Sequence, residues 1–241
     1  NTDVAITAKE QVAQEDGSNP PFDASILETV EDVDGVRQAS GDVFSQGAIL
    51  DQEGDSTGGG VSPQFIASAS PEGLESVEYI EGGRPEAPGE AALDEAAAER
   101  SDLGLGDTIL LVGTGKARPF TLVGLTRLGG ASFGGTSIAQ VILPVAQQIT
   151  GEEGKFDQIT VAAEEGVSPE ELRDRIARVV PDDLLVETGE ENADRQASEI
   201  RDNLSFLSIA LLAFAAISLF VGSFVIFNVF SILIGQRIRE L

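Results

Sequence analysis

The chain has 241 residues, among them no Cys, His, Trp or Met, and its formal net charge is -26. The absence of Cys and His excludes disulfides, thiol catalysis and iron–sulfur clusters, and it removes the commonest general base and metal ligand. The acidity argues against nucleic-acid binding, because no basic stripe is available to neutralise phosphates. We interpret the charge as a solvating surface.

The first seventy residues are predicted to form strands around one helix. Ile26, Leu27, Val30 and Val33 recur at helical spacing and share one face. The acidic, glycine-rich run 51–62 predicts a solvated loop. The expected elements are a strand at Val4–Thr7, a helix at Asp23–Asp32, a strand at Val36–Phe44 and the start of another strand at Ile49–Leu50.

Residues 71–150 form a different block, which is rich in glycine and in short apolar runs. We expect a mostly-β subdomain here, inserted into a split α/β subdomain. The predicted strands are Glu90–Leu93, Thr108–Val112, Phe120–Leu125 and Val141–Leu143. The predicted helices are Glu95–Ser101 and Pro144–Ile149.

Residues 151–189 repeat the strand–helix–strand order of residues 1–70. Ser168 followed by Pro169 and Glu171 is a strong helix start, with a capping hydroxyl, a Pro at the first position and a Glu at the third. Strands are predicted at Gln158–Ala163 and from Leu184 to Val186. We therefore predict an α+β domain in which 1–70 and 151–189 form one small α/β subdomain of two βαβ-like halves, with both helices on one face of the sheet.

Residues 204–235 are 32 consecutive residues without a charge. About 20 apolar residues cross the roughly 30 Å hydrocarbon core, so we predict a transmembrane helix. A charged helical stalk at residues 190–203 leads into it without a Gly or Pro break. Arg237 and Arg239 follow the span, and basic residues beside a span stay in the cytoplasm. We expect a bacterial cell-membrane protein, continued at both ends, that is extracytoplasmic before about residue 204 and cytoplasmic at 236–241.

Two sets of residues in this helical region are candidates for packing against neighbouring helices. The first is an apolar stripe with spacings of three and four, and the second contains small or polar residues within the span. The stripe consists of Ile200, Leu204, Leu207 and Leu211. The second set consists of Ser218, Gly222 and Asn228. We expect the second set to favour a helix bundle over a lone anchor.

Two runs resemble ligand-binding loops but lack required residues. Leu111–Lys116 lacks the first Gly of a phosphate-binding loop, and Ala117 stands in place of Ser or Thr. Asp51–Asp55 resembles half of a calcium loop, but Ser62 and Pro63 lie where the bidentate Glu is needed. We therefore assign no catalytic, cofactor-binding or metal site to this chain.

Several segments stand in an informative order along the chain. They are Tyr79–Arg84, Gly89–Glu90, Leu103–Leu111, Phe120–Leu125 and Gly166–Ile176. In this order and spacing they resemble the MacB-like periplasmic core domain. The long apolar helix that ends in QRIREL resembles the entry into the FtsX-like permease domain of ABC transporters. Together, the resemblance covers nearly the whole chain.

The resemblance implies a permease subunit with an external domain that contains an inserted part. It implies a cytoplasmic ATPase partner that binds ATP and Mg²⁺, and permeases that pair as homodimers or heterodimers in membrane lipid. Hydrolysis in the partner would move the external domain for export or extraction of a substrate.

Two alternatives stay open beside this hypothesis. The same architecture could transmit a signal, either by regulating a cell-wall enzyme or by sensing a ligand. A membrane-anchored enzyme that uses a pair of carboxylates is the third hypothesis.

Overall fold

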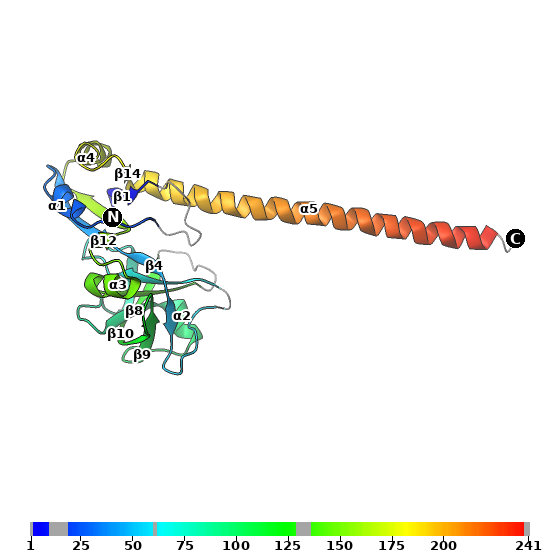
Figure 1. Ribbon diagram of the computed structural model, residues 1–241, viewed down its shortest axis with the longest axis horizontal. Helices are drawn as coiled ribbons and strands as arrows, with labels where there is room; N and C mark the ends of the chain where they lie inside the picture. Colours follow the sequence, from blue (N-terminus) through cyan, green and yellow to red (C-terminus); the bar gives the residue numbers. More distant parts are fainter. Residues whose placement is uncertain (1, 10–18, 60–61, 129–135, 239–241) are drawn as a thin grey trace. The chain divides into compact units, whose positions relative to one another are not determined.

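The computed structural model describes residues 2–9, 19–59, 62–128 and 136–238 (Figure 1). The side chains of residues 128, 196, 199–210 and 231–238 lie outside this description. The chain divides into two units, residues 1–190 and residues 191–241. The first unit contains two main sheets, and the second lies within one long helix.

A four-stranded antiparallel sheet is built from both ends of the first unit. Its strands are β1 (Val4–Ala8), β3 (Val36–Asp42), β13 (Gln158–Ala163) and β14 (Leu184–Thr188), in the order β14-β1-β13-β3. Helix α1 (Ile26–Glu31) lies between β1 and β3 in the chain, and α4 (Pro169–Ile176) lies between β13 and β14. Each connection skips one strand, so two split βαβ units interleave in one sheet. This confirms that both ends of the domain share a small α/β layer.

Both helices cover the same face of this sheet. Val4 and Ile6 of β1 lie opposite Val161 and Ile159 of β13, and alternate residues of a strand point to the same face. The four side chains are fully buried. They form one core cluster with Val30 of α1 and with Leu172 and Ile176 of α4.

The second sheet contains eight strands and closes on itself. Its order is β4-β6-β11-β8-β10-β9-β5, with β7 paired to β10. The strands are β4 (Phe44–Gln46), β5 (Ala48–Leu50), β6 (Gln64–Ser68), β7 (Val77–Gly82), β8 (Glu90–Asp94), β9 (Thr108–Val112), β10 (Arg118–Leu128) and β11 (Ser137–Val141). Only Gly47 separates β4 from β5, so the two ends of the strand order are parts of one interrupted strand. The closed sheet packs with α2 (Glu95–Arg100) and α3 (Leu143–Thr150) around a separate core.

The seam of this closed sheet depends on Gly47 and Gln64. A Cβ at Gly47 would lie 2.6 Å from the Ile66 side chain and 2.9 Å from the carbonyl oxygen of Val112. Gln64 is buried, and its carboxamide accepts from the amide of Ile49 at 2.9 Å and donates to the carbonyl of Ile49 at 3.1 Å. A side chain therefore supplies the pairing where β5 and β6 meet.

The strand pairing corrects three expectations. We expected residues 1–70 in the split subdomain, but β4, β5 and β6 pair in the eight-stranded sheet. The predicted strand Val36–Phe44 breaks after Asp42, because Val43 is buried in the core of the second sheet. The predicted strand Val141–Leu143 ends at Val141, because Pro144 lies in the first turn of α3.

A short two-stranded sheet joins distant parts of the chain. It pairs β2 (Phe22–Asp23) with β12 (Lys155–Phe156). β12 directly precedes β13, so it lies on the return path of the chain from the eight-stranded to the four-stranded sheet.

Candidate functional site

The last strand of the domain leads without a loop into a long apolar helix. β14 ends at Thr188, and α5 (Gly189–Ile238) has 50 residues, which corresponds to about 75 Å of helix. Within it, Leu211–Phe230 has a mean hydropathy of 2.2. By length and composition this stretch can cross a membrane.

The expected stalk and span thus form a single uninterrupted helix. The described apolar stretch, 20 residues, lies inside the predicted range 204–235. Its side chains are exposed throughout, and Phe220 exposes 73% of its surface. A continuous apolar surface of this kind marks a membrane or protein contact rather than a surface that faces water.

All seven predicted packing residues lie in α5. At about 100° per residue, Leu211, Ser218 and Gly222 fall within about 40° of one another, so they share one face of the helix. Asn228 lies about 100° away from Leu211 and belongs to a different face. All four are exposed, and a Cβ at Gly222 would meet no atom within 4 Å. Their role in helix packing stays a prediction.

The side chains of the other three predicted residues lie outside the described part of the structure. Ile200, Leu204 and Leu207 belong to the helical backbone of α5. Their proposed contacts also stay a prediction.

The first residue of α5 is held against the start of β1. The amide of Gly189 donates to the carbonyl oxygen of Asp3 at 2.9 Å. A Cβ at residue 189 would lie 2.2 Å from the carbonyl oxygen of Thr2, so only glycine fits there without a backbone shift. The chain before β1 and the helix after β14 therefore meet at one point of the domain.

Asp3 also links this point to β13. Its amide donates to the carbonyl oxygen of Val161 at 3.0 Å, and its carboxylate accepts from the amide of Ala163 at 2.8 Å. One residue thus connects the start of β1, the end of β13 and the start of α5. We refer to Thr2, Asp3 and Gly189 as the helix anchor.

Sequence reasoning missed the helix anchor, although two signals were present. A Gly between a strand and a helix often marks a close approach of two backbones. Asp3 stands directly before an apolar strand, where a carboxylate can bind a neighbouring amide. Neither signal identifies the partner, because both partners are distant in the sequence.

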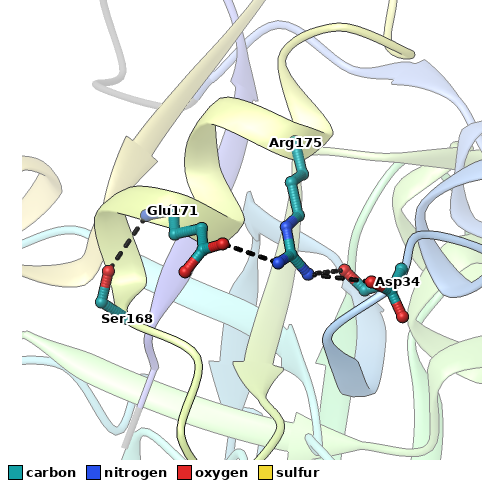
Figure 2. A network of polar contacts seen from close by, with 4 residues as sticks. All are labelled: Asp34, Ser168, Glu171 and Arg175. Atoms are coloured by element: carbon teal, nitrogen blue, oxygen red, sulfur yellow. Dashed lines mark hydrogen bonds and ion pairs between the residues drawn. The ribbon is translucent and has the colours of Figure 1, made fainter.

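A polar network joins α4 to the turn after α1 (Figure 2). The guanidinium of Arg175 donates to Glu171 at 2.7 Å and to the carbonyl oxygen of Asp34 at 2.7 Å. The hydroxyl of Ser168 accepts from the amide of Glu171 at 3.2 Å and caps the helix, as the sequence predicts. Because its ion pairs are partly exposed, each of them adds little stability. We assign this network a structural role.

An open groove lies over α2, β7 and β10. Its volume is about 540 Å³, and its apolar part is contributed by Ile80, Ala98, Leu103 and Leu125. Arg127 forms a bidentate pair with Glu95, with contacts of 2.6 and 2.9 Å. In the described ranges, no group of three or more acidic side chains is arranged to hold a metal ion.

The two loop-like runs have structural roles. The carboxylate of Asp51 accepts from the amide of Asp55 at 2.8 Å, so it closes its own turn. Leu111–Lys116 leaves β9 at Val112, and the amide of Thr114 donates to the carbonyl oxygen of Ile149 at 2.9 Å. A Cβ at Gly113 would lie 2.2 Å from the same oxygen, so this glycine serves the approach to α3.

Two aspartates have raised pKa values because burial disfavours the charged form. Burial raises the pKa of Asp94, although its carboxylate accepts from the amides of Ala97 and Ile138. Burial raises the pKa of Asp42 from 3.8 to about 6, and hydroxyl hydrogen bonds offset part of this effect. Asp94 caps α2, whereas Asp42 lies where the chain passes between the two sheets.

These observations define a class: a two-sheet α/β domain carried on a helix that is able to span a membrane. Solved structures of low sequence identity share the fold. The periplasmic region of MacB from Actinobacillus actinomycetemcomitans is similar with a TM-score of 0.58 and 13% identity, over 82% of this chain and 92% of that one. The extracellular domain of the noncanonic ABC-type transporter YknZ from Gram-positive bacteria has a TM-score of 0.56 and 13% identity, over 78% and 100%.

A domain of a putative permease protein from Porphyromonas gingivalis is also similar, with a TM-score of 0.50 and 16% identity, over 78% of this chain and 88% of that one. A search of curated proteins found no match. The MacB-like periplasmic core domain family matches residues 1–179. The chain belongs to this family, and it is the extracytoplasmic domain of an ABC-transporter permease, with one candidate span among the residues that the structure describes.

Proposed function

We propose that this chain is the permease part of an ABC transporter of the MacB and FtsX type, in which a cytoplasmic partner hydrolyses ATP. Hydrolysis moves α5, and α5 moves the extracytoplasmic domain, so that a substrate is exported or extracted. The observation that supports this proposal is the direct passage of β14 into α5, together with the helix anchor.

The helix anchor supports a stiff connection. β14 pairs with β1 over five residues, and β1 pairs in turn with β13. A displacement of the start of α5 therefore acts on the middle of the four-stranded sheet, because no flexible linker lies between them. Long-range coupling can be carried by rigid secondary structure that has two discrete arrangements.

The proposal includes an orientation and partners. The basic residues Arg237 and Arg239 follow the span, which supports a cytoplasmic C-terminal side. ATP and Mg²⁺ then bind to the ATPase partner, while two permeases pair through their membrane helices. Leu211, Ser218 and Gly222 are candidates for that contact because they share one helix face.

The first test is co-expression of the intact gene product with the ATPase encoded beside it. We expect the two proteins to co-purify in detergent as a complex that hydrolyses ATP. A permease that purifies alone, and whose addition leaves the ATPase rate unchanged, contradicts the proposal and favours an anchored enzyme or a receptor. Efflux from reconstituted vesicles would then support transport. Recovery of a hydrolase bound to the external domain would instead support signal transmission.

A second test addresses the stiff connection in the same complex. Insertion of Gly-Ser-Gly after Glu190 should abolish the ATP-dependent change in mobility of a spin label at Arg178→Cys, while ATP hydrolysis continues. The matched control is the same insertion after Gly54, in an exposed turn of the eight-stranded sheet, which should preserve the ATP-dependent change. An unaltered response after the first insertion excludes mechanical coupling through α5.

A further inference from the structure

The chain passes between the two sheets at two places that lie side by side. It leaves the four-stranded sheet at Asp42 and enters β4 at Phe44, and it returns through β12 and Asp157 into β13. The amide of Asp157 donates to the carbonyl oxygen of Asp42 at 2.9 Å. The carboxylate of Asp157 accepts from the amide of Phe44 at 2.7 Å. These two hydrogen bonds therefore link the outgoing and the returning segments of the chain.

The carboxylate of Asp42 accepts hydrogen bonds from both sides of this junction. The hydroxyl of Thr160, on β13, donates to it at 2.8 Å, and the hydroxyl of Ser70, just after β6, donates at 3.0 Å. Ser68 contributes in the same region, since its hydroxyl accepts from the amide of Val43 at 3.0 Å. Asp42 is half-buried as a residue, but its carboxylate is enclosed by protein.

The surroundings of this carboxylate provide hydroxyl groups rather than a counterion. Among the described residues, no Lys or Arg forms an ion pair with Asp42. The charged groups on the surrounding elements include Asp157, exposed Lys155 of β12, Arg84 and Glu152, and β3 carries Arg37 at its opposite end. Arg84 donates to the carbonyl oxygen of Ser70 at 3.2 Å, and Glu152 accepts from the hydroxyl of Ser45 at 3.2 Å. The negative charges of Asp157 and Glu152 do not stabilise the ionised form of Asp42.

We propose that this junction is a proton-responsive joint, in which protonation of Asp42 tightens the attachment between the four-stranded and the eight-stranded sheet and ionisation loosens it. A neutral carboxyl group removes an unpaired charge from a region that is poor in water. It also gains one O–H donor, which the hydroxyl of Thr160 can rotate to accept, while the other carboxyl oxygen still accepts from the hydroxyl of Ser70. An extracytoplasmic domain meets the pH of the external medium, so the joint would respond to acidification outside the cell.

The direction of the pH effect follows from the pKa of Asp42, which burial raises from 3.8 to about 6 in the folded state. The folded state binds this proton on the order of a hundredfold more tightly than an unfolded chain does. The stabilisation is therefore complete below about pH 4 and is lost as the pH rises through about 6. Above about pH 7 the joint should be in its looser form.

The experiment uses the full chain in lipid nanodiscs, and the absence of native Cys makes site-specific labelling simple. Spin labels at Arg178→Cys, after α4, and Lys116→Cys, between β9 and β10, report the distance between the sheets, since both positions are exposed. We expect a narrower distance distribution at pH 4.5 than at pH 7.5, where the pH values bracket the transition. A distribution that does not change with pH overturns the proposal.

Variants assign the response to Asp42. Asp42→Asn has a permanently neutral side chain and should keep the narrow distribution at both pH values. Glu53→Gln, at an exposed position of the loop after β5, should retain the wild-type response. A pH response that persists in Asp42→Asn overturns the proposal. If Asp42→Asn does not fold, Ser70→Ala is the alternative test. This substitution removes a hydrogen bond that lowers the pKa of Asp42, so the midpoint of the pH response must move to higher pH. A midpoint that stays or falls contradicts the role of Asp42.

Discussion

The carboxamide of Gln64 binds both backbone polar groups of Ile49, with distances of 2.9 Å to its amide and 3.1 Å to its carbonyl. The same side chain donates to the hydroxyl of Thr57 at 3.2 Å. The side chain of Gln64 therefore takes the place of a backbone partner where β5 and β6 meet. All three residues are buried.

Gln64→Leu should destabilise the eight-stranded sheet by about 1–3 kcal/mol, because it leaves the buried amide of Ile49 without its partner, while the carbonyl of Ile49 keeps the amide and the hydroxyl of Thr57 as donors. Urea unfolding can be followed by the fluorescence of Tyr79, the single tyrosine in a chain without tryptophan. Gln46→Leu, at an exposed position of neighbouring β4, serves as the control and should change stability by less than about 0.5 kcal/mol. Equal effects of the two substitutions would contradict the role of Gln64.

Gly189→Ala should weaken the helix anchor. Its new methyl group would fall 2.2 Å from the carbonyl oxygen of Thr2, and relief of that clash moves the amide away from Asp3. We expect a loss of about 1–3 kcal/mol in thermal unfolding and faster hydrogen exchange along β1.

The matched control for this substitution is Gly104→Ala. A Cβ at Gly104 would lie 3.9 Å from its nearest neighbour, the carboxylate of Asp107, which is an ordinary contact. Protection of β1 in the Gly189→Ala protein at the wild-type level would show that the close approach is unimportant.

Within the α4 network, the cap should matter more than the ion pair. Ser168→Ala removes the acceptor for the amide of Glu171 and should cost about 1 kcal/mol. Glu171→Gln removes a charge from the partly exposed pair with Arg175 and should cost less than about 0.5 kcal/mol. Urea denaturation of both variants tests the order, and the reverse order would contradict this account.

In the membrane, Ser218 and Phe220 offer a direct test of the packing face. Two residues on a helix differ by about 200°, so these side chains point in nearly opposite directions. We expect Ser218→Cys to form a disulfide between subunits several-fold more efficiently than Phe220→Cys, because a small residue permits close approach. Equal cross-linking, or stronger cross-linking at Phe220, would place the contact on another face.

Much of the local structure could be predicted from the sequence. The strand Gln158–Ala163 is found with the predicted bounds, and the Ser168 and Pro169 signal marks the start of α4. The uncharged run after residue 204 lies in one helix with its charged stalk. These features depend on short-range periodicity and capping, which a single sequence records directly.

The division between the sheets depends on distant contacts and could not be predicted. The sequence predicts one strand over Val36–Phe44, but Val43 lies in the core of the second sheet. β6 lies parallel to β11, about seventy residues later, so its burial is decided by a partner that local patterns do not reveal. The helix anchor was missed for the same reason, since Asp3 and Gly189 lie at opposite ends of the domain.

The proximity of Asp42 and Asp157 also has a consequence for how this domain can change. β3 and β13 are antiparallel neighbours, with Asp42 opposite Gln158. With a short turn in place of residues 43–157 they would form a simple hairpin, and tight surface connections are the sites at which whole domains are inserted with least disturbance. The eight-stranded sheet can therefore be exchanged, enlarged or lost as a module, while the part that is joined to the membrane helix keeps its own core.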